Sequence, residues 1–245
     1  MTTSSRLRAD RLLVERGLFE SRAKAQAAIE AGLVSANDVA VRKASEEIPL
    51  DARLEARVTH PYVSRGGVKL AAALDRFGFD PKGRVCLDFG ASTGGFTQVL
   101  LERGAARVYA VDVGRGQLHE SLRARPGVVA LEETDIRDFS PAPLEQRPDL
   151  ITVDVSFISL KLVLPAALAL AKRPAQLVAL IKPQFEAGRG ALKKGIVRDE
   201  AVRQAVCEDV AAFVAGLGWR VIGVTPSPIA GRDGNVEYLL GAARD

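Results

Sequence analysis

The stretch Asp88-Phe-Gly-Ala-Ser-Thr-Gly-Gly-Phe96 decides the fold of this chain. It begins at the end of a predicted strand and leads into a predicted helix, so its glycines fall in the turn between the two. Glycine allows the backbone to turn sharply and to approach a ligand closely. The stretch therefore predicts the first strand–loop–helix unit of a sheet that binds a ligand at the carboxyl ends of its strands.

Around this loop, strands and helices alternate from Ser64 onward. The segments Leu150–Asp154 and Leu177–Ile181 are apolar throughout, which is typical of parallel strands covered on both faces. The pattern predicts a Rossmann-like, doubly wound α/β sheet. We expect strands at 84–88, 107–113, 128–132, 149–155, 176–182, 219–225 and 236–241, and helices at 66–77, 95–103, 117–123, 159–171 and 200–217.

The chain changes character near residue 60, where Pro61 cannot continue a strand ladder and marks a linker. We expect a small α+β domain at 1–59, a linker at 60–63 and the α/β domain at 64–245. In the first domain the pattern predicts a helix over 7–17, a helix over 21–32 capped by Ser21, a hairpin over 33–41 turning at Asn37-Asp38, and short strands at 48 and 54–58.

The composition is that of an ordinary globular protein, with 245 residues of which 47% are hydrophobic and 26% charged. The longest apolar stretch, Leu162–Ala171, is about half the length that spans a bilayer, and the N-terminus has no signal-peptide core. We therefore expect a cytoplasmic protein without a membrane partner. Cys86, Cys207 and two isolated histidines form no metal or redox spacing, so we predict no metal site and two core cysteines.

The net charge of +4 permits a polyanionic partner, and the cations lie in two patches. Residues 1–28 hold six cations and three anions, and residues 182–203 hold the same numbers. Solvated helix faces would account for either patch alone, so that alternative stays open. If RNA is the partner, the candidate contacts are Arg6, Arg8, Arg11, Arg22, Lys24, Arg65, Arg189, Lys193 and Lys194.

Two acids beside the glycine loop indicate which cofactor it binds. Asp112 ends the second strand, 22 residues after Gly90, and suits the ribose hydroxyls of either NAD or S-adenosylmethionine. Asp88 could pair with the ammonium of S-adenosylmethionine but would repel a pyrophosphate, so the sulfonium cofactor is favoured. Packing remains an alternative for any one glycine, and helix capping for Asp135. The expected contacts are Asp88, Gly90, Ser92, Gly94, Gly95, Phe96, Asp112, Asp135 and Ile136.

The methyl acceptor is indicated partly by absent motifs. The fourth strand runs into Asp154-Val-Ser-Phe157 and not into the Pro-Pro-aromatic motif of enzymes that methylate exocyclic amines. Methylation at carbon 5 of cytosine needs a cysteine nucleophile, and neither cysteine sits at a strand end. A hydroxyl acceptor remains, and it requires a base.

Lys182 is the predicted base because it follows an apolar strand, where its amine should project over the site. A second ammonium at Lys69 would favour the neutral amine of Lys182 by like-charge repulsion. Glu237 would orient and partly balance the lysines, and Asp154 would lie near the sulfonium and align the attack. Surface positions remain the alternative for Lys69 and Glu237.

These residues lie in stretches that together resemble the TlyA family of ribosomal RNA ribose 2'-O-methyltransferases, historically called hemolysins, whose catalytic domain is FtsJ-like. The stretches are Val63-Ser-Arg-Gly-Gly-Val-Lys69, Cys86-Leu-Asp-Phe-Gly-Ala-Ser-Thr-Gly-Gly-Phe-Thr97, Asp112-Val-Gly-Arg-Gly-Gln-Leu118, Asp154-Val-Ser-Phe-Ile-Ser-Leu160, Leu180-Ile-Lys-Pro-Gln-Phe-Glu186 and Gly234-Asn-Val-Glu-Tyr238. The resemblance implies a catalytic tetrad of Lys69, Asp154, Lys182 and Glu237.

The N-terminal residues Arg8-Ala-Asp-Arg-Leu-Leu-Val-Glu-Arg-Gly17 and Ser21-Arg-Ala-Lys-Ala25 resemble the small RNA-binding domain of ribosomal protein S-four. The expected function is S-adenosylmethionine-dependent 2'-O-methylation of cytidine in the RNA of ribosomal subunits or ribosomes. Two alternatives stay open: a membrane-lytic hemolysin, and a catalytically silent RNA-binding assembly factor. The linker carries Tyr62 where some relatives have Trp.

Overall fold

The computed structural model describes residues 6–19, 21–30, 32–56, 60–139, 144–231 and 234–245, without the side chains of Ile136 and Arg189. The chain divides into two compact units, Met1–Pro61 and Tyr62–Asp245. Each unit has buried apolar clusters of its own. Within the described residues, no helix has both the length and the apolar character needed to cross a membrane.

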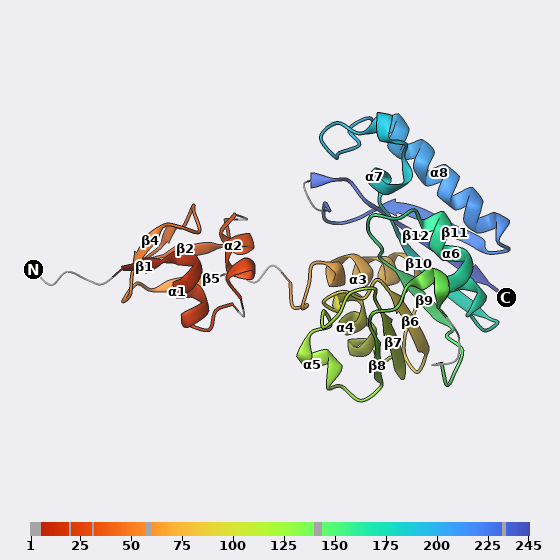
Figure 1. Cartoon of the computed structure of the whole chain (residues 1–245), viewed down its shortest axis with the longest axis horizontal. Helices are drawn as coiled ribbons and strands as arrows, with labels where there is room; N and C mark the ends of the chain where they lie inside the picture. The colour runs from red at the N-terminus through yellow and green to blue at the C-terminus, as the bar shows by residue number, and fades with distance from the viewer. Residues whose placement is uncertain (1–5, 20, 31, 57–59, 140–143, 232–233) are drawn as a thin grey trace, which may run out of the picture. The chain divides into compact units, whose positions relative to one another are not determined.

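The N-terminal unit contains two helices and two small antiparallel sheets, β1-β4 and β3-β2-β5 (Figure 1). Ser21 caps the second helix through its Oγ, and Asn37 and Asp38 both have the positive φ that a two-residue hairpin turn requires, as predicted. The elements are β1 (Arg6–Arg8), α1 (Ala9–Glu15), α2 (Arg22–Glu30), β2 (Val34–Ala36), β3 (Val39–Ala40), β4 (Glu47–Pro49) and β5 (Leu54–Ala56).

The predicted start of the first helix is wrong, because Leu7 belongs to β1 and pairs with Ile48 of β4. The helical spacing of Leu7, Leu12 and Leu13 is compatible with either structure. A strand partner 41 residues away decides between them, and no local pattern reveals that partner.

The C-terminal unit contains every strand and helix predicted for it, with boundaries shifted by a few residues, and adds α7 and two short 3-10 turns. Its elements are α3 (Gly66–Phe77), β6 (Val85–Phe89), α4 (Gly95–Glu102), β7 (Arg107–Val111), α5 (Glu120–Arg123), β8 (Val128–Leu131), η1 (Ile136–Asp138), β9 (Leu150–Val153), α6 (Leu160–Ala169), β10 (Ala175–Ile181), α7 (Pro183–Glu186), η2 (Arg189–Ala191), α8 (Glu200–Gly216), β11 (Arg220–Pro226) and β12 (Tyr238–Arg244).

Seven strands form one sheet in the order β11-β12-β10-β9-β6-β7-β8, with helices on both faces (Figure 1). Alternate residues of β10 serve the two faces. Leu177, Ala179 and Ile181 pack in the cluster that holds α6 and α8, whereas Val178 and Leu180 pack in the cluster that holds α3 and α4. This alternation within a continuously apolar strand confirms that the sheet is covered on both sides.

The sheet places the carboxyl ends of β6 and β9 side by side at the point where the order of the strands reverses. β6 pairs in parallel with both β7 and β9, so the loop after β6 opens between neighbours that wind in opposite directions. The Asp154 backbone N–H donates to the Phe89 carbonyl oxygen at 2.9 Å. Gly90 has a φ of +79°, and a β-carbon there would collide with the Asp154 carbonyl oxygen. Ligands of doubly wound sheets bind at this kind of position.

One strand of the sheet runs against its neighbours. β12 lies between β10 and β11 and is antiparallel to both. Its register pairs Ile181 with Tyr238, so the last residue of β10 lies opposite the first residue of β12. Lys182 follows Ile181 and Glu237 precedes Tyr238, so the antiparallel register brings both residues to the same end of the two strands.

Candidate active site

The four predicted catalytic residues lie on different elements and meet as two ion pairs. Lys69 in the first turn of α3 pairs with Glu237, which immediately precedes β12. Lys182, directly after β10, has its Nζ 2.6 Å from Oδ1 of Asp154, which directly follows β9. Lys69 and Lys182 are each 8% exposed and Glu237 is 3% exposed, so these charges are largely withdrawn from water. Buried charges are stable only when paired, and both pairs meet that condition.

The pairing changes the expected division of roles between the lysines. The charge closest to the Lys182 amine is the Asp154 carboxylate, and Glu237 neutralises Lys69 directly. The closest charge interaction of Lys182 is therefore its attraction to Asp154, and not repulsion by Lys69. An incoming cation beside Asp154 would instead compete with Lys182 for the carboxylate.

Lys182 has a further partner that the sequence did not single out. Its Nζ donates to Ser156 Oγ at 2.8 Å with hydrogen-bond geometry. Asp154 Oδ1 lies close to the Lys182 Nζ, but this contact does not have the angles of a hydrogen bond, and Oδ1 accepts no other hydrogen bond from the described residues. The serine stands two residues after Asp154 in the loop that follows β9, and the motif Asp154-Val-Ser-Phe157 already contained it.

The same loop exposes an aromatic ring. Phe157 is 86% exposed and has a φ of +65°, a left-handed conformation that is costly for a bulky residue. Its ring lies 5.1 Å from that of Phe185 in α7, with a 49° angle between the planes. Glu186, which ends α7, accepts hydrogen bonds from Ser159 Oγ and from the Leu160 N–H, and this holds α7 against the start of α6. The sequence marked Phe157 only by its place after Asp154.

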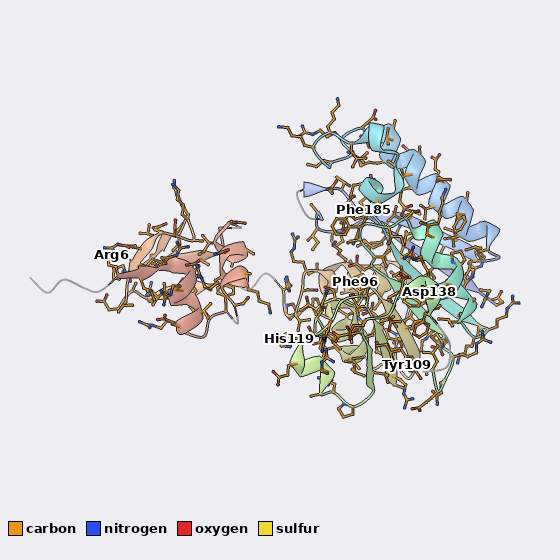
Figure 2. The ribbon with its side chains drawn as sticks, in the orientation of Figure 1. Arg6, Phe96, Tyr109, His119, Asp138 and Phe185 are labelled. Atoms are coloured by element: carbon orange, nitrogen blue, oxygen red, sulfur yellow. The ribbon has the colours of Figure 1, made fainter. Side chains whose placement is uncertain are left out.

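The glycine loop divides into an open part and a packed part. Ser92 is exposed, with a φ of +46°, and Gly90 is partly exposed. A β-carbon at Gly94 would collide with Leu118, just before α5, and with Leu122 in α5, and one at Gly95 would collide with Ser64 Oγ. Phe96 is buried against α3, inside the unit (Figure 2). Gly94, Gly95 and Phe96 thus have packing roles here, and their direct contact with a cofactor remains a prediction.

Asp112 holds the loops at the ends of β6 and β7 together. Its two carboxylate oxygens accept from the Ser92 N–H at 2.8 Å and from the Gly114 N–H at 2.7 Å. Asp112 itself is 9% exposed, whereas Val113, directly after it, is 66% exposed. Asp112 therefore lies at the rim of the open loop, where the sequence placed the ribose contact, and that contact also remains a prediction.

Asp135 has partners of its own. Its carboxylate accepts from the backbone N–H and the guanidinium of Arg137. These hydrogen bonds lower the pKa of Asp135 to about 2. The capping role that the sequence left open is thus present, and contact with an adenine remains a prediction. The side chain of Ile136 lies outside the described residues.

Asp88 lies below the open face of the loop, and its side chain is fully buried. Its carboxyl group accepts from Thr97 Oγ1 at 2.7 Å and from Thr152 Oγ1 at 3.0 Å. Burial raises the pKa of Asp88 to about 7, although the two hydroxyl groups act in the opposite direction. In this arrangement Asp88 joins β6 to α4 and β9. Its predicted pairing with a cofactor ammonium would have to act across the loop or after the loop moves.

We predict that Asp88→Asn removes a pH-dependent loss of stability. The carboxyl group is protonated in both states below about pH 4, only in the folded state between about 4 and 7, and in neither state above that. The free energy of unfolding of the wild-type chain should therefore fall by up to roughly 4 kcal/mol between pH 4 and pH 8, and that of the variant should not. Urea unfolding at pH 5 and pH 8 measures the difference. Parallel pH dependence of the two proteins would contradict the assignment.

Two of the predicted RNA contacts in the N-terminal unit, Arg8 and Arg22, bind one buried acid. Asp10 is fully buried and accepts from Arg8 at 3.1 Å, from Arg22 at 2.7 Å and from Gln26 at 2.8 Å. The Arg8 hydrogen bond holds the pKa of Asp10 well below its usual range. The side chains of Arg8 and Arg22 are 44% and 53% exposed, so each binds Asp10 while much of its surface stays open to solvent.

The other predicted RNA contacts are placed as follows. Arg6 donates to the Glu47 carbonyl oxygen at 2.8 Å, and Arg11 lies 3.7 Å from Glu15. Lys24 is half-buried on α2. In the other unit, Arg65 is exposed at the start of α3, and Lys193 and Lys194 are exposed on a turn between η2 and α8. The side chain of Arg189 lies outside the described residues.

Both cysteines are buried, as predicted, Cys86 in β6 and Cys207 in α8. Burial raises the pKa of Cys207 to about 11, which disfavours the thiolate. Neither residue lies at the carboxyl end of a strand. Among the described residues, no group of three His, Cys, Asp or Glu side chains is arranged to hold a metal ion.

A family model described as FtsJ-like methyltransferase matches residues 62–244, which is nearly the whole C-terminal unit. The chain belongs to this family. It is therefore a methyltransferase, and its cofactor is S-adenosylmethionine. The doubly wound sheet, the glycine loop at the reversal point and Asp112 at its rim fit that cofactor, since they leave an open backbone and a carboxylate side by side.

Relatives of this FtsJ-like chain cover it almost completely. "16S/23S rRNA (cytidine-2'-O)-methyltransferase TlyA" of Mycobacterium tuberculosis is 47% identical over 96% of this chain and 89% of its own length. "Putative rRNA methyltransferase YqxC" of Bacillus subtilis is 47% identical over 97% of this chain and 86% of its own. A solved structure described as "Putative hemolysin from Streptococcus thermophilus" is 41% identical, covers 99% of this chain and 90% of its own, and has a TM-score of 0.79.

Proposed function

We propose that this chain methylates the ribose 2'-hydroxyl of a cytidine in ribosomal RNA, within ribosomal subunits or ribosomes. The observation that carries the proposal is the placement of a lysine, Lys182, between Asp154 and Ser156 at the strand ends beside the cofactor loop. A hydroxyl acceptor must lose its proton to a base as it attacks, whereas carbon-5 methylation of cytosine would also need a cysteine nucleophile, and both cysteines are buried away from the strand ends. The printed name of the Mycobacterium tuberculosis relative supports the choice of ribosomal RNA, cytidine and the 2'-oxygen.

S-adenosylmethionine, when bound, supplies a methyl group on a positively charged sulfur. Lys182 takes the proton from the ribose hydroxyl as the oxygen attacks, and it must be neutral to do so. Asp154 faces the incoming positive charge and becomes the natural partner of the sulfonium, which frees the Lys182 amine. Glu237 neutralises the buried Lys69, and the register of β12 brings this pair to the strand ends where Lys182 stands.

The basic residues supply the grip on RNA. The side chains of Arg8 and Arg22 are about half exposed, and Lys193 and Lys194 are exposed on one turn. Arginine and lysine bind phosphates through charge and hydrogen bonds, which makes binding salt-sensitive. Phe157 lies in the same loop as Asp154 and Ser156, and its ring is exposed and tilted against that of Phe185. This ring offers a surface on which an unstacked base could stack.

The test uses ribosomal subunits from a strain that lacks the gene. Purified protein and S-adenosylmethionine labelled in the methyl group should transfer label to RNA, and mapping of 2'-O-methyl marks should locate it on a cytidine. Cofactor binding without transfer to either subunit or to whole ribosomes would favour a silent assembly factor. Release of dye from lipid vesicles by the purified protein would favour the membrane-lytic alternative.

We predict that Asp112→Ala weakens S-adenosylmethionine binding about 10- to 100-fold, because it removes a charged hydrogen-bond partner at the loop rim. Titration calorimetry measures the affinity. Asp138→Ala provides the control, since this acid lies in η1 at the surface. Equal affinity of Asp112→Ala and the wild-type protein would overturn this placement of the cofactor.

A further inference from the structure

Ser156 is the one hydrogen-bond acceptor among the described residues that engages the Lys182 amine with hydrogen-bond geometry. Its side chain is exposed on the loop after β9, whereas Lys182 is almost completely buried. The serine thus stands between the buried amine and the open side of the site. No part of the reaction described above requires a hydroxyl group at this position.

The backbone around Ser156 is held in place on both sides. Before it, the Asp154 N–H is bound to β6 through the Phe89 carbonyl oxygen. After it, Phe157 adopts a left-handed φ of +65°, which a phenylalanine takes up only when its surroundings demand it. The turn at Phe157 sends the ring outward against Phe185 and leaves the serine hydroxyl against Lys182. Strain of this kind collects where a fixed geometry is needed.

The Lys182 nitrogen has three positions besides its bond to carbon. Ser156 Oγ lies at 2.8 Å and accepts an N–H, whereas Asp154 Oδ1 lies at 2.6 Å without hydrogen-bond geometry. In a neutral amine the N–H that Ser156 accepts fixes one of these positions. The lone pair and the second N–H share the other two, so Ser156 restricts the directions that the lone pair can take.

We propose that Ser156 is a positioning residue that aims the Lys182 lone pair at the acceptor hydroxyl. The proposal rests on the function proposed above. In the transfer step the C–S bond breaks with its electron pair going to sulfur, the ribose oxygen forms the new C–O bond, and the hydroxyl proton moves to the Lys182 lone pair. Ser156 accepts an N–H before and after this step, so it holds the amine in both protonation states.

Without the serine the amine keeps no hydrogen bond of good geometry to the described residues, and its lone pair can rotate away. A misdirected base costs about 10- to 100-fold in rate. We therefore expect Ser156→Ala to lower the single-turnover rate about 10- to 100-fold at saturating cofactor and RNA, with the affinities for both unchanged. Ser156→Thr retains Oγ and should stay within about threefold of the wild-type rate. Raising the pH should not rescue Ser156→Ala, because orientation is lost and not deprotonation.

Ser159 provides the matched control in the same loop. Its Oγ binds Glu186 and accepts from the Lys161 N–H at the start of α6, so it stabilises structure without touching Lys182. Ser159→Ala should lower the melting temperature and leave the single-turnover rate of the folded protein unchanged, the opposite of what we expect for Ser156→Ala.

Three outcomes would overturn the inference: a wild-type rate in Ser156→Ala, an equal rate loss in Ser156→Thr, or a loss of Ser156→Ala activity that follows a fall in melting temperature or cofactor affinity. Failure of the proposed function is distinguishable, because the wild-type protein would then transfer no methyl group to ribosomal RNA and the variants could not differ in rate.

Discussion

Lys182→Arg should bind S-adenosylmethionine and RNA normally and yet lose about 10²- to 10⁴-fold in the single-turnover rate of methyl transfer. Arginine retains the positive charge beside Asp154 but does not release its proton at accessible pH, so it cannot act as a base. Rapid mixing of preformed protein–cofactor complex with ribosomal subunits measures the rate directly. Calorimetry and filter binding measure the two affinities.

Lys161→Arg is the control for the substitution itself. Lys161 lies on α6, where it pairs with Asp209 at the surface, away from the strand ends. This variant should be fully active. A near-normal rate in Lys182→Arg would remove Lys182 as the base and leave charge and positioning by Asp154 and Glu237 as the main contributions to catalysis.

Removal of residues 1–61 should abolish methylation of ribosomal RNA while S-adenosylmethionine affinity stays within about twofold of the full chain. The N-terminal unit and residues 62–245 each have an apolar core of their own, so the cut falls between two compact units. The basic residues of the first unit supply phosphate contacts, and losing them should weaken RNA binding most at physiological salt. Methylation assays and calorimetry on both proteins check the two halves of this prediction.

A finer variant of the full chain avoids the deletion. Arg6→Glu with Arg11→Glu reverses two exposed charges and leaves the Asp10 network with Arg8 and Arg22 intact. It should weaken RNA binding and flatten its salt dependence without changing the melting temperature of the unit. The N-terminal unit would not be the RNA anchor if the truncated protein methylated ribosomes as fast as the full chain.

Local patterns were sufficient for much of the fold. Continuous apolar runs identified β9 and β10, and the residues around Ser21 and Asn37-Asp38 identified a helix start and a hairpin turn. Each of these signals is written within a few residues, because capping and turn geometry depend on neighbours along the chain. The glycine loop was equally local, since a sharp turn after β6 needs residues that accept a positive φ.

Local patterns did not determine which role a side chain takes up. The sequence placed Asp88 and Phe96 in one cofactor loop, and the structure turns both inward, Asp88 to Thr97 and Thr152. Thr152 lies directly opposite Asp88 on the neighbouring strand, 64 residues away. The direction of a side chain at a strand end depends on such partners, and the spacing along the chain contains no record of them.

The sequence by itself determined that lysines and carboxylates stand at strand ends beside a glycine loop. Only the tertiary structure decided how they pair. Because β12 enters antiparallel between β10 and β11, its first residue, Tyr238, lies opposite Ile181, and Glu237 comes to the edge where Lys182 stands. There Glu237 takes Lys69 as its partner, and Lys182 is left to Asp154 and Ser156. Strand order and register are set by packing across the whole sheet, so no single segment of the sequence specifies them.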